Sequence, residues 1–244
     1  MTEIFKTIFY QPILNFVVFL YNVIPGHDLG VTIIVLTIII KLILLPLSKS
    51  SIKSQKELQE LQPKLEELKK KHANNKEELG RATLELYKQH KINPFSSCLP
   101  LLIQLPFLIA VFQVFRDNFS ASSLNYLYPF IHKPETINNI AFGFLDLSAN
   151  HNLILAVLAG AAQFWQSKML ITKRPEKKVP GTKDEDFAAI MNQQMMYILP
   201  LMTVWFSYTF PAGLALYWFI LTVLGGVQQY FIFKKKEAEV LHKS

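Results

Sequence analysis

The sequence predicts an all-α integral membrane protein with five transmembrane helices, a cytoplasmic antiparallel helical hairpin and an N-terminal interfacial amphipathic helix. Hydrophobic residues make up 51% of the 244 residues and charged residues only 18%, which is too apolar for a soluble domain of this size. The apolar residues form blocks of about twenty, the length that crosses about 30 Å of hydrocarbon as a helix. The blocks lack the alternation of barrel strands, so helices are the expected spanning structure.

Residues 1–28 are predicted to form a helix on the outer face of the membrane. Thr7, Gln11, Asn15 and Asn22 recur at helical spacing on one stripe, and such amphipathic helices lie in the interface. The segment is also long enough to span, which is the alternative. A cleaved signal peptide is disfavoured, because the basic n-region is thin and no small-x-small cleavage site follows.

The remaining segments follow from the apolar blocks and the charges between them. The predicted order is span 1 at 29–48, the hairpin at 49–93, span 2 at 94–117, an outer loop at 118–151, span 3 at 152–171, a cytoplasmic loop at 172–192, span 4 at 193–210, span 5 at 212–233 and a basic cytoplasmic tail at 234–244.

The distribution of the net charge of +7 predicts the orientation. Residues 49–93 carry eleven Lys or Arg against seven Asp or Glu, residues 172–192 carry five Lys or Arg, and residues 117–151 contain only Lys133. Basic loops stay in the cytoplasm. We therefore expect the N-terminus outside and the C-terminus inside. The single cysteine, Cys98, excludes an internal disulfide framework.

The segment 49–93 is predicted to be two helices, because leucines repeat at spacings of three and four on each side of Asn74-Asn75. Its lysines either form a solvated face or bind anionic headgroups or ribosomal RNA. The predicted cytoplasmic basic surface consists of Lys53, Lys56, Lys64, Lys69, Lys70, Lys71, Lys234, Lys235 and Lys236.

Lys41 is the candidate site residue that the apolar blocks single out. A charge at the bilayer centre costs about 2.5–3.5 kcal/mol on insertion scales. Lys41 stands about 9 Å from the cytoplasmic end of its block, so its stem could snorkel to the interface. Against this simple explanation, Thr37 lies one turn from Lys41, and two other spans supply polar groups at similar depth, namely Gln104, Gln163 and Gln166. A water-filled recess open to the cytoplasm would hydrate them all.

Absent residues exclude several functions. No Asp or Glu lies inside the apolar blocks of the predicted spans (Leu29–Leu47, Leu99–Phe115, Leu153–Ile171, Met195–Phe210 and Ala212–Phe233), so a carboxylate proton relay has no residues to use. All six histidines lie outside the spans, and no HExxH, GxSxG or Walker sequence occurs. Intramembrane catalysis and a metal site are therefore not expected.

Ordered motifs along the chain resemble those of the YidC family of membrane protein insertases, with relatives in mitochondria and chloroplasts. The resemblance runs from Leu29 to Lys236 and rests on the cation before Leu-Pro-Leu (Lys41–Leu47), LQP (Leu61–Pro63), ELYKQHKINP (Glu85–Pro94), SCLPLLIQLP (Ser97–Pro106), FWQSKM (Phe164–Met169), FPAGLALYW (Phe210–Trp218) and QQY (Gln228–Tyr230).

The resemblance implies a five-helix core whose hydrophilic groove opens to the cytoplasm and to lipid, with the hairpin at its mouth. It places the groove cation at Lys41, where the family usually has arginine, so the charge is kept without the planar guanidinium fork. Thr37, Gln104, Tyr217 and Trp218 fall on positions that resemble groove or substrate contacts.

The implied function is that of a membrane protein insertase or chaperone that works without nucleotide hydrolysis or catalytic chemistry. Nascent membrane proteins and the lipid bilayer are the implied partners, with the Sec translocon and the ribosome as candidates and no cofactor. The expected location is the bacterial inner or plasma membrane. The alternative is a small solute transporter or channel, which predicts internal repeats, and we find no convincing repeat. A purely structural assembly factor is a third interpretation.

Overall fold

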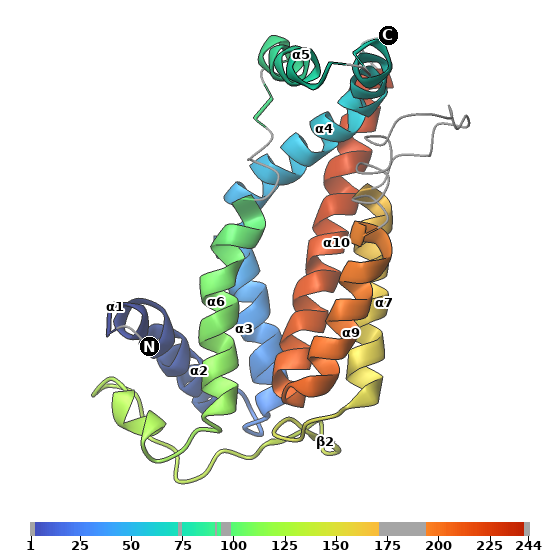
Figure 1. Cartoon of the computed structure of the whole chain (residues 1–244). Helices are drawn as coiled ribbons and strands as arrows, with labels where there is room; N and C mark the ends of the chain where they lie inside the picture. The colour runs from blue at the N-terminus through green and yellow to red at the C-terminus, as the bar shows by residue number, and fades with distance from the viewer. Residues whose placement is uncertain (1–2, 73–74, 91, 94–98, 171–193, 242–244) are drawn as a thin grey trace.

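The computed structural model describes residues 3–72, 75–90, 92–93, 99–170 and 194–241, and these are mostly helical (Figure 1). The elements are α1 (Glu3–Phe5), the π-helical turn η1 (Lys6–Tyr10), α2 (Gln11–Val23), α3 (Leu29–Ile43), α4 (Leu45–Lys71), α5 (Lys76–Gln89), α6 (Leu99–Arg116), the 3-10 turn η3 (Ser123–Tyr126), β1 (Ile140–Ala141), β2 (Leu145–Asp146), α7 (Leu153–Leu170), the π-helical turn η4 (Gln194–Ile198), α9 (Leu199–Thr209) and α10 (Ala212–Leu241).

This architecture agrees with the predicted class of an all-α membrane protein. By length and composition, two helical stretches of the described chain could cross a membrane, Glu3–Val23 and Ala212–Lys234, and the bent pair α3–α4 would make a third. The part of α6 from Leu102 to Arg116 is apolar but shorter. One addition to the prediction is the antiparallel pair β1–β2 within the α6–α7 loop (residues 117–152), where Ile140 pairs with Asp146 and Ala141 with Leu145.

α3, α6, α7, α9 and α10 form an upright bundle (Figure 1), in which α10 packs against all four other helices. Two glycines allow close packing around α7. A Cβ at Gly160 would lie 2.2 Å from Val204 Cγ2 on α9, and a Cβ at Gly226 would lie 2.3 Å from Trp165 Cζ3. Small residues at such crossings let helices approach closely enough for van der Waals packing. These contacts hold α7, α9 and α10 together as one half of the bundle.

α3 begins at Leu29 because Asp28 caps it. Asp28 Oδ1 accepts a hydrogen bond from the Val31 N–H at 2.9 Å, which satisfies a donor that the first helical turn leaves free. Asp28 Oδ2 accepts from the Phe142 N–H at 2.6 Å. The same carboxylate therefore fixes the start of α3 and attaches the α6–α7 loop to it.

α3 ends sooner than the predicted span, whose apolar run extends to Leu47. The helix stops at Ile43, and the chain turns by 69° into α4. Pro46 stands in the first turn of α4, where its missing N–H leaves no hydrogen bond unmade. The apolar run is thus divided between two helices. As a result, Lys41 lies in the last turn of α3, next to the bend.

The polar stripe of α2 bonds to the α6–α7 loop. Asn15 is 2% exposed; its side-chain nitrogen donates to the Tyr126 carbonyl at 2.9 Å, and its oxygen accepts from the Tyr128 N–H at 2.6 Å. Gln11 donates to the same Tyr126 carbonyl at 3.0 Å, and Asn22 donates to a further loop carbonyl at 2.7 Å. Much of the stripe is therefore satisfied by protein. The opposite face of α2 contributes to the bundle core.

α4 and α5 run in opposite directions beside each other, at the end of the bundle far from the α6–α7 loop (Figure 1). Lys64 Nζ lies 3.0 Å from His90 Nε2, and His72 Nδ1 lies 3.4 Å from Glu78 Oε2. α4 continues through Pro63, although a proline inside a helix removes one backbone donor. Asn75 caps α5 by accepting from the Glu78 N–H at 3.1 Å.

Candidate functional site

Lys41 projects from the last turn of α3 and is half-buried. Within the described chain, no hydrogen bond or ion pair of its ammonium group is found. An ammonium group offers three donors and no acceptor. Removal from water without an acceptor is costly, and Lys41 keeps only part of its surface exposed.

Gly225 on α10 provides the space in which Lys41 and Gln166 come together. A Cβ at Gly225 would lie 3.3 Å from Lys41 Nζ and 2.8 Å from Gln166 Nε2. Since both nitrogens approach one point, side chains from α3 and α7 meet on the surface of α10. The arrangement presents an ammonium and an amide within reach of the same ligand, and the absence of a side chain at residue 225 permits it.

Gln104 and Tyr217 form a second polar pair, between α6 and α10. Gln104 Nε2 donates to the Tyr217 hydroxyl oxygen at 2.8 Å. The Tyr217 side chain is fully buried. Tyr217 precedes Gly225 by eight residues, so the two positions lie about 12 Å apart along α10. The predicted polar residues are therefore arranged at two levels of the bundle.

Three of the predicted site residues, Thr37, Gln163 and Trp218, make their side-chain contacts with residues other than Lys41. The buried Thr37 hydroxyl donates to the Ile33 carbonyl of its own helix at 2.6 Å. Gln163 donates to Ser167, also on its own helix, at 3.4 Å. Trp218 stacks on Phe206 of α9, with ring centroids 6.3 Å apart. The last placement follows from the helix turn, because Trp218 points about 100° away from Tyr217.

Two residues of α10 were not singled out for the site by sequence, Gly225 and Gln229. Gln229 stands one turn beyond Gly225, is 2% exposed, and its Nε2 has no hydrogen-bond partner in the described chain. A buried amide without a partner is uncommon. The signal in the sequence is the run of residues 225–229, Gly-Gly-Val-Gln-Gln, in which only the valine has an apolar side chain. Such a run is unusual inside a predicted span.

The predicted basic surface is only partly described. The side chains of Lys235 and Lys236 lie outside the described part of the chain, as does the predicted loop 172–192. Lys56 Nζ lies 4.9 Å from the centroid of the Phe233 ring, a contact that joins α4 to α10. The exposed members are Lys53, Lys64, Lys70, Lys71 and Lys234, and Lys69 is half-buried.

Comparison with protein families gives a match to the family described as 60Kd inner membrane protein, over residues 19–239. A membrane protein insertase YidC of Fusobacterium nucleatum is 38% identical over 228 residues, covering 93% of this chain and 97% of the relative. The YidC of Geobacter sulfurreducens is 34% identical over 223 residues, covering 91% of this chain but 36% of the relative. The chain thus spans about a third of that longer relative.

Among solved structures, the chain is similar to a crystal structure of an active YidC insertase with its first transmembrane domain resolved. The TM-score is 0.60 at 26% sequence identity, over 93% of this chain and 46% of that one. The solved structure with a similar helical arrangement is thus a YidC insertase, as are the two sequence relatives.

Proposed function

Because the chain belongs to the 60Kd inner membrane protein family, whose members include the YidC insertases, we propose that it inserts nascent membrane proteins into the lipid bilayer of a bacterial inner membrane. The match covers residues 19–239, and the relative from Fusobacterium nucleatum has nearly the same extent. The expected partners are nascent membrane proteins and the bilayer itself. A solute transporter or channel is not favoured by these likenesses.

In the proposed topology, the five predicted spans correspond, in chain order, to α3, α6, α7, the continuous stretch η4–α9, and α10. The positive-inside rule puts α4, α5 and the C-terminal end of α10 in the cytoplasm, with the α6–α7 loop outside. The N-terminal helix would then lie along the outer interface. Its hydrogen bonds to the α6–α7 loop support this placement, since they anchor α2 to the outer end of the bundle.

The convergence of Lys41 and Gln166 at Gly225 carries the proposal for the site. A polar segment of a substrate leaving the cytoplasm has to lose water, and unpaired donors in the cytoplasmic half of the bundle replace part of that hydration. The substrate's apolar segment is then stabilised in lipid by about 25 cal/mol per Å2 of buried apolar surface. This sequence of events lowers a barrier and involves no bond cleavage or nucleotide.

The basic surface of the hairpin and tail would serve a second set of partners. Its exposed lysines project from α4 and from the end of α10, where they would face cytoplasmic polyanions such as ribosomal RNA or anionic headgroups. The Sec translocon is a further proposed partner. Loss of ribosome cosedimentation on neutralising Lys64, Lys70 and Lys71 would support the assignment to RNA.

The test uses purified full-length protein in liposomes and a single-span substrate whose translocated tail carries either Glu or Gln. We expect Lys41→Ala to lower insertion of the Glu tail about fivefold, equivalent to about 1 kcal/mol for one charge near the membrane surface, and to affect the Gln tail less. Lys41→Arg should retain the preference. Gly225→Ala should reduce it, because the new Cβ occupies the meeting point of the two nitrogens.

Val227→Leu is the matched control, because Val227 is exposed on the same turn of α10. Equal insertion of the Glu tail by the wild type and Lys41→Ala would reject the role of Lys41. Failure of the wild type to increase insertion of either tail, or saturable solute flux into the liposomes, would reject the insertase function itself.

A further inference from the structure

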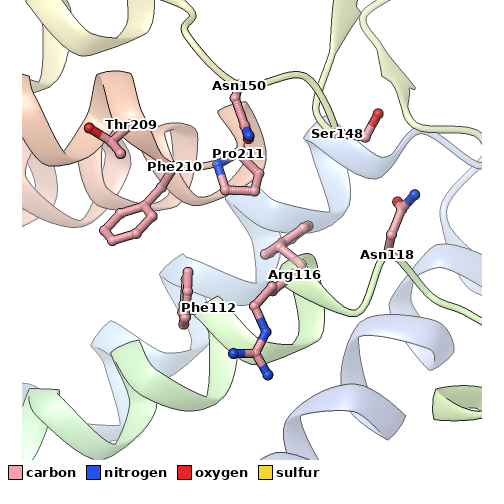
Figure 2. Close-up of a pocket in the computed structure, with 9 residues that line it drawn as sticks. Phe112, Arg116, Asn118, Ser148, Asn150, Thr209, Phe210 and Pro211 are labelled. Atoms are coloured by element: carbon pink, nitrogen blue, oxygen red, sulfur yellow. The ribbon is translucent and has the colours of Figure 1, made fainter.

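A cavity of about 390 Å3 lies at the end of the bundle opposite α4. Figure 2 shows Phe112 and Arg116 of α6 on one side, and Phe210, Pro211 and Asn150 on the other. Phe112 and Phe210 approach each other, with ring centroids 5.0 Å apart. The cavity is therefore built between the end of α6, the α9–α10 turn and the α6–α7 loop.

Arg116 is the charged residue among those that line this cavity. Its guanidinium lies over the Phe112 ring, 5.6 Å from the centroid, and its Nε is 3.7 Å from Asp117 Oδ1. The Asp117 carboxylate also accepts a hydrogen bond from the Tyr10 hydroxyl at 2.9 Å. Within the described chain, no hydrogen bond of the Arg116 guanidinium is found, so its terminal N–H groups are available to an anion.

In the proposed topology, on which this inference rests, the cavity lies at the depth of the outer lipid headgroups. Arg116 is the first charged residue after the apolar run Leu99–Phe115, and α9 ends at Thr209 on the opposite wall. Apolar helices end where hydrocarbon meets water, which is where lipid phosphates lie. Exposed apolar side chains continue from Arg116 along one face of α6, at Ile109, Leu105 and Leu102. This stripe is about 21 Å long, a length comparable with an acyl chain.

We propose that the cavity binds the phosphate-bearing headgroup of a membrane phospholipid. Arg116 pairs with the phosphate oxygens, for which the planar guanidinium fork is suited. The glycerol region packs against the contacting rings of Phe112 and Phe210, and one acyl chain follows the apolar stripe of α6. The volume lies within the range of sites that hold small molecules. Both the charge and the depth favour a lipid over a soluble anion.

The experiment uses the full-length protein in a maltoside detergent, which carries no phosphate, and phosphatidylglycerol with a diazirine near its headgroup. After irradiation at a subsaturating probe concentration, labelled peptides are mapped by mass spectrometry. We expect label on peptides from the end of α6 and the α9–α10 turn. Arg116→Gln should lower this label about tenfold, the effect of losing one charge-assisted hydrogen bond.

Lys133→Gln is the matched control, because it removes an exposed positive charge from the α6–α7 loop without altering the cavity. Unchanged thermal unfolding midpoints for both variants exclude loss of fold as the cause. An equal loss of label in both variants would overturn the proposal, as would equal labelling by a phosphate-free glycolipid probe. Crosslinks from Asn150 to a stalled nascent chain in place of lipid label would also overturn it.

Discussion

Gly160→Ala should destabilise the bundle, although alanine is normally the better helix former. The new Cβ would lie 2.2 Å from Val204 Cγ2 and 3.4 Å from the Pro200 carbonyl oxygen. Ordinary van der Waals contact begins at 3.4 Å, so α7 and α9 have to separate by about 1 Å at this crossing. Val204 cannot readily turn away, because a β-branched side chain on a helix has one strongly preferred rotamer.

The magnitude follows from two opposing effects. Overpacking a close contact costs about 1–3 kcal/mol, whereas replacing glycine by alanine within a helix contributes about 0.5–1 kcal/mol in its favour. The net expectation is a destabilisation of about 1 kcal/mol, which lowers an unfolding midpoint by about 2–4 °C for a chain of this length. Trp165 on α7 and Trp205 on α9 provide a fluorescence readout of unfolding in detergent.

Two comparisons isolate the contact. Gly80→Ala on α5 makes the same change where nothing lies within 4 Å of the new Cβ, and it should raise or preserve the midpoint. Val204→Ala should cost less in the Gly160→Ala background than in the wild type, because it removes the methyl group that clashes. If Gly160→Ala behaves like Gly80→Ala, the close approach of α7 and α9 is not a determinant of stability.

The other polar contacts give two further expectations, both measured as unfolding midpoints in detergent. Asn15→Leu should destabilise the protein by on the order of 3 kcal/mol, because it leaves buried backbone groups of the α6–α7 loop without partners. Asn22→Leu removes one exposed hydrogen bond and should cost much less. Equal effects of the two substitutions would contradict the role assigned to Asn15. Tyr217→Phe should cost about 1 kcal/mol by removing the acceptor of Gln104. The effects of Tyr217→Phe and Gln104→Leu should be less than additive, and strict additivity would show that the pair does not interact energetically.

The sequence predicts the elements of this fold where the controlling signal is local. The apolar run of α3 and the leucine spacing of α4 are such signals, because helix periodicity is contained in adjacent residues. The bend at Leu44 is missed because Pro46 lies inside an apolar run that reads as one span. In the structure, that proline is in the first turn of a new helix.

The sequence predicts how deep each candidate site residue lies along its helix, but not which way each helix turns its faces. Counting the rise per residue puts Lys41 and Gln166 at similar levels, and the structure does bring them together. Counting does not show which face α10 turns toward them, so Gly225 is missed and Trp218 is grouped with Tyr217. The helical spacing of polar residues also does not predict the hydrogen-bond partner of Asn15, since Tyr126 is 111 residues away in the chain.

The bend between α3 and α4 connects movement of α4 to the turn of α3 that carries Lys41. α4 has 27 residues and is therefore about 40 Å long, and it is connected to the last turn of α3 through the single residue Leu44. A pivot of about 5° at Leu44 moves the far end of such a rod by about 3.5 Å. Conversely, a load on the tip of the hairpin acts as a torque on the helical turn that carries Lys41. The contact between Lys56 and the Phe233 ring is one of those between α4 and α10 that oppose such a pivot.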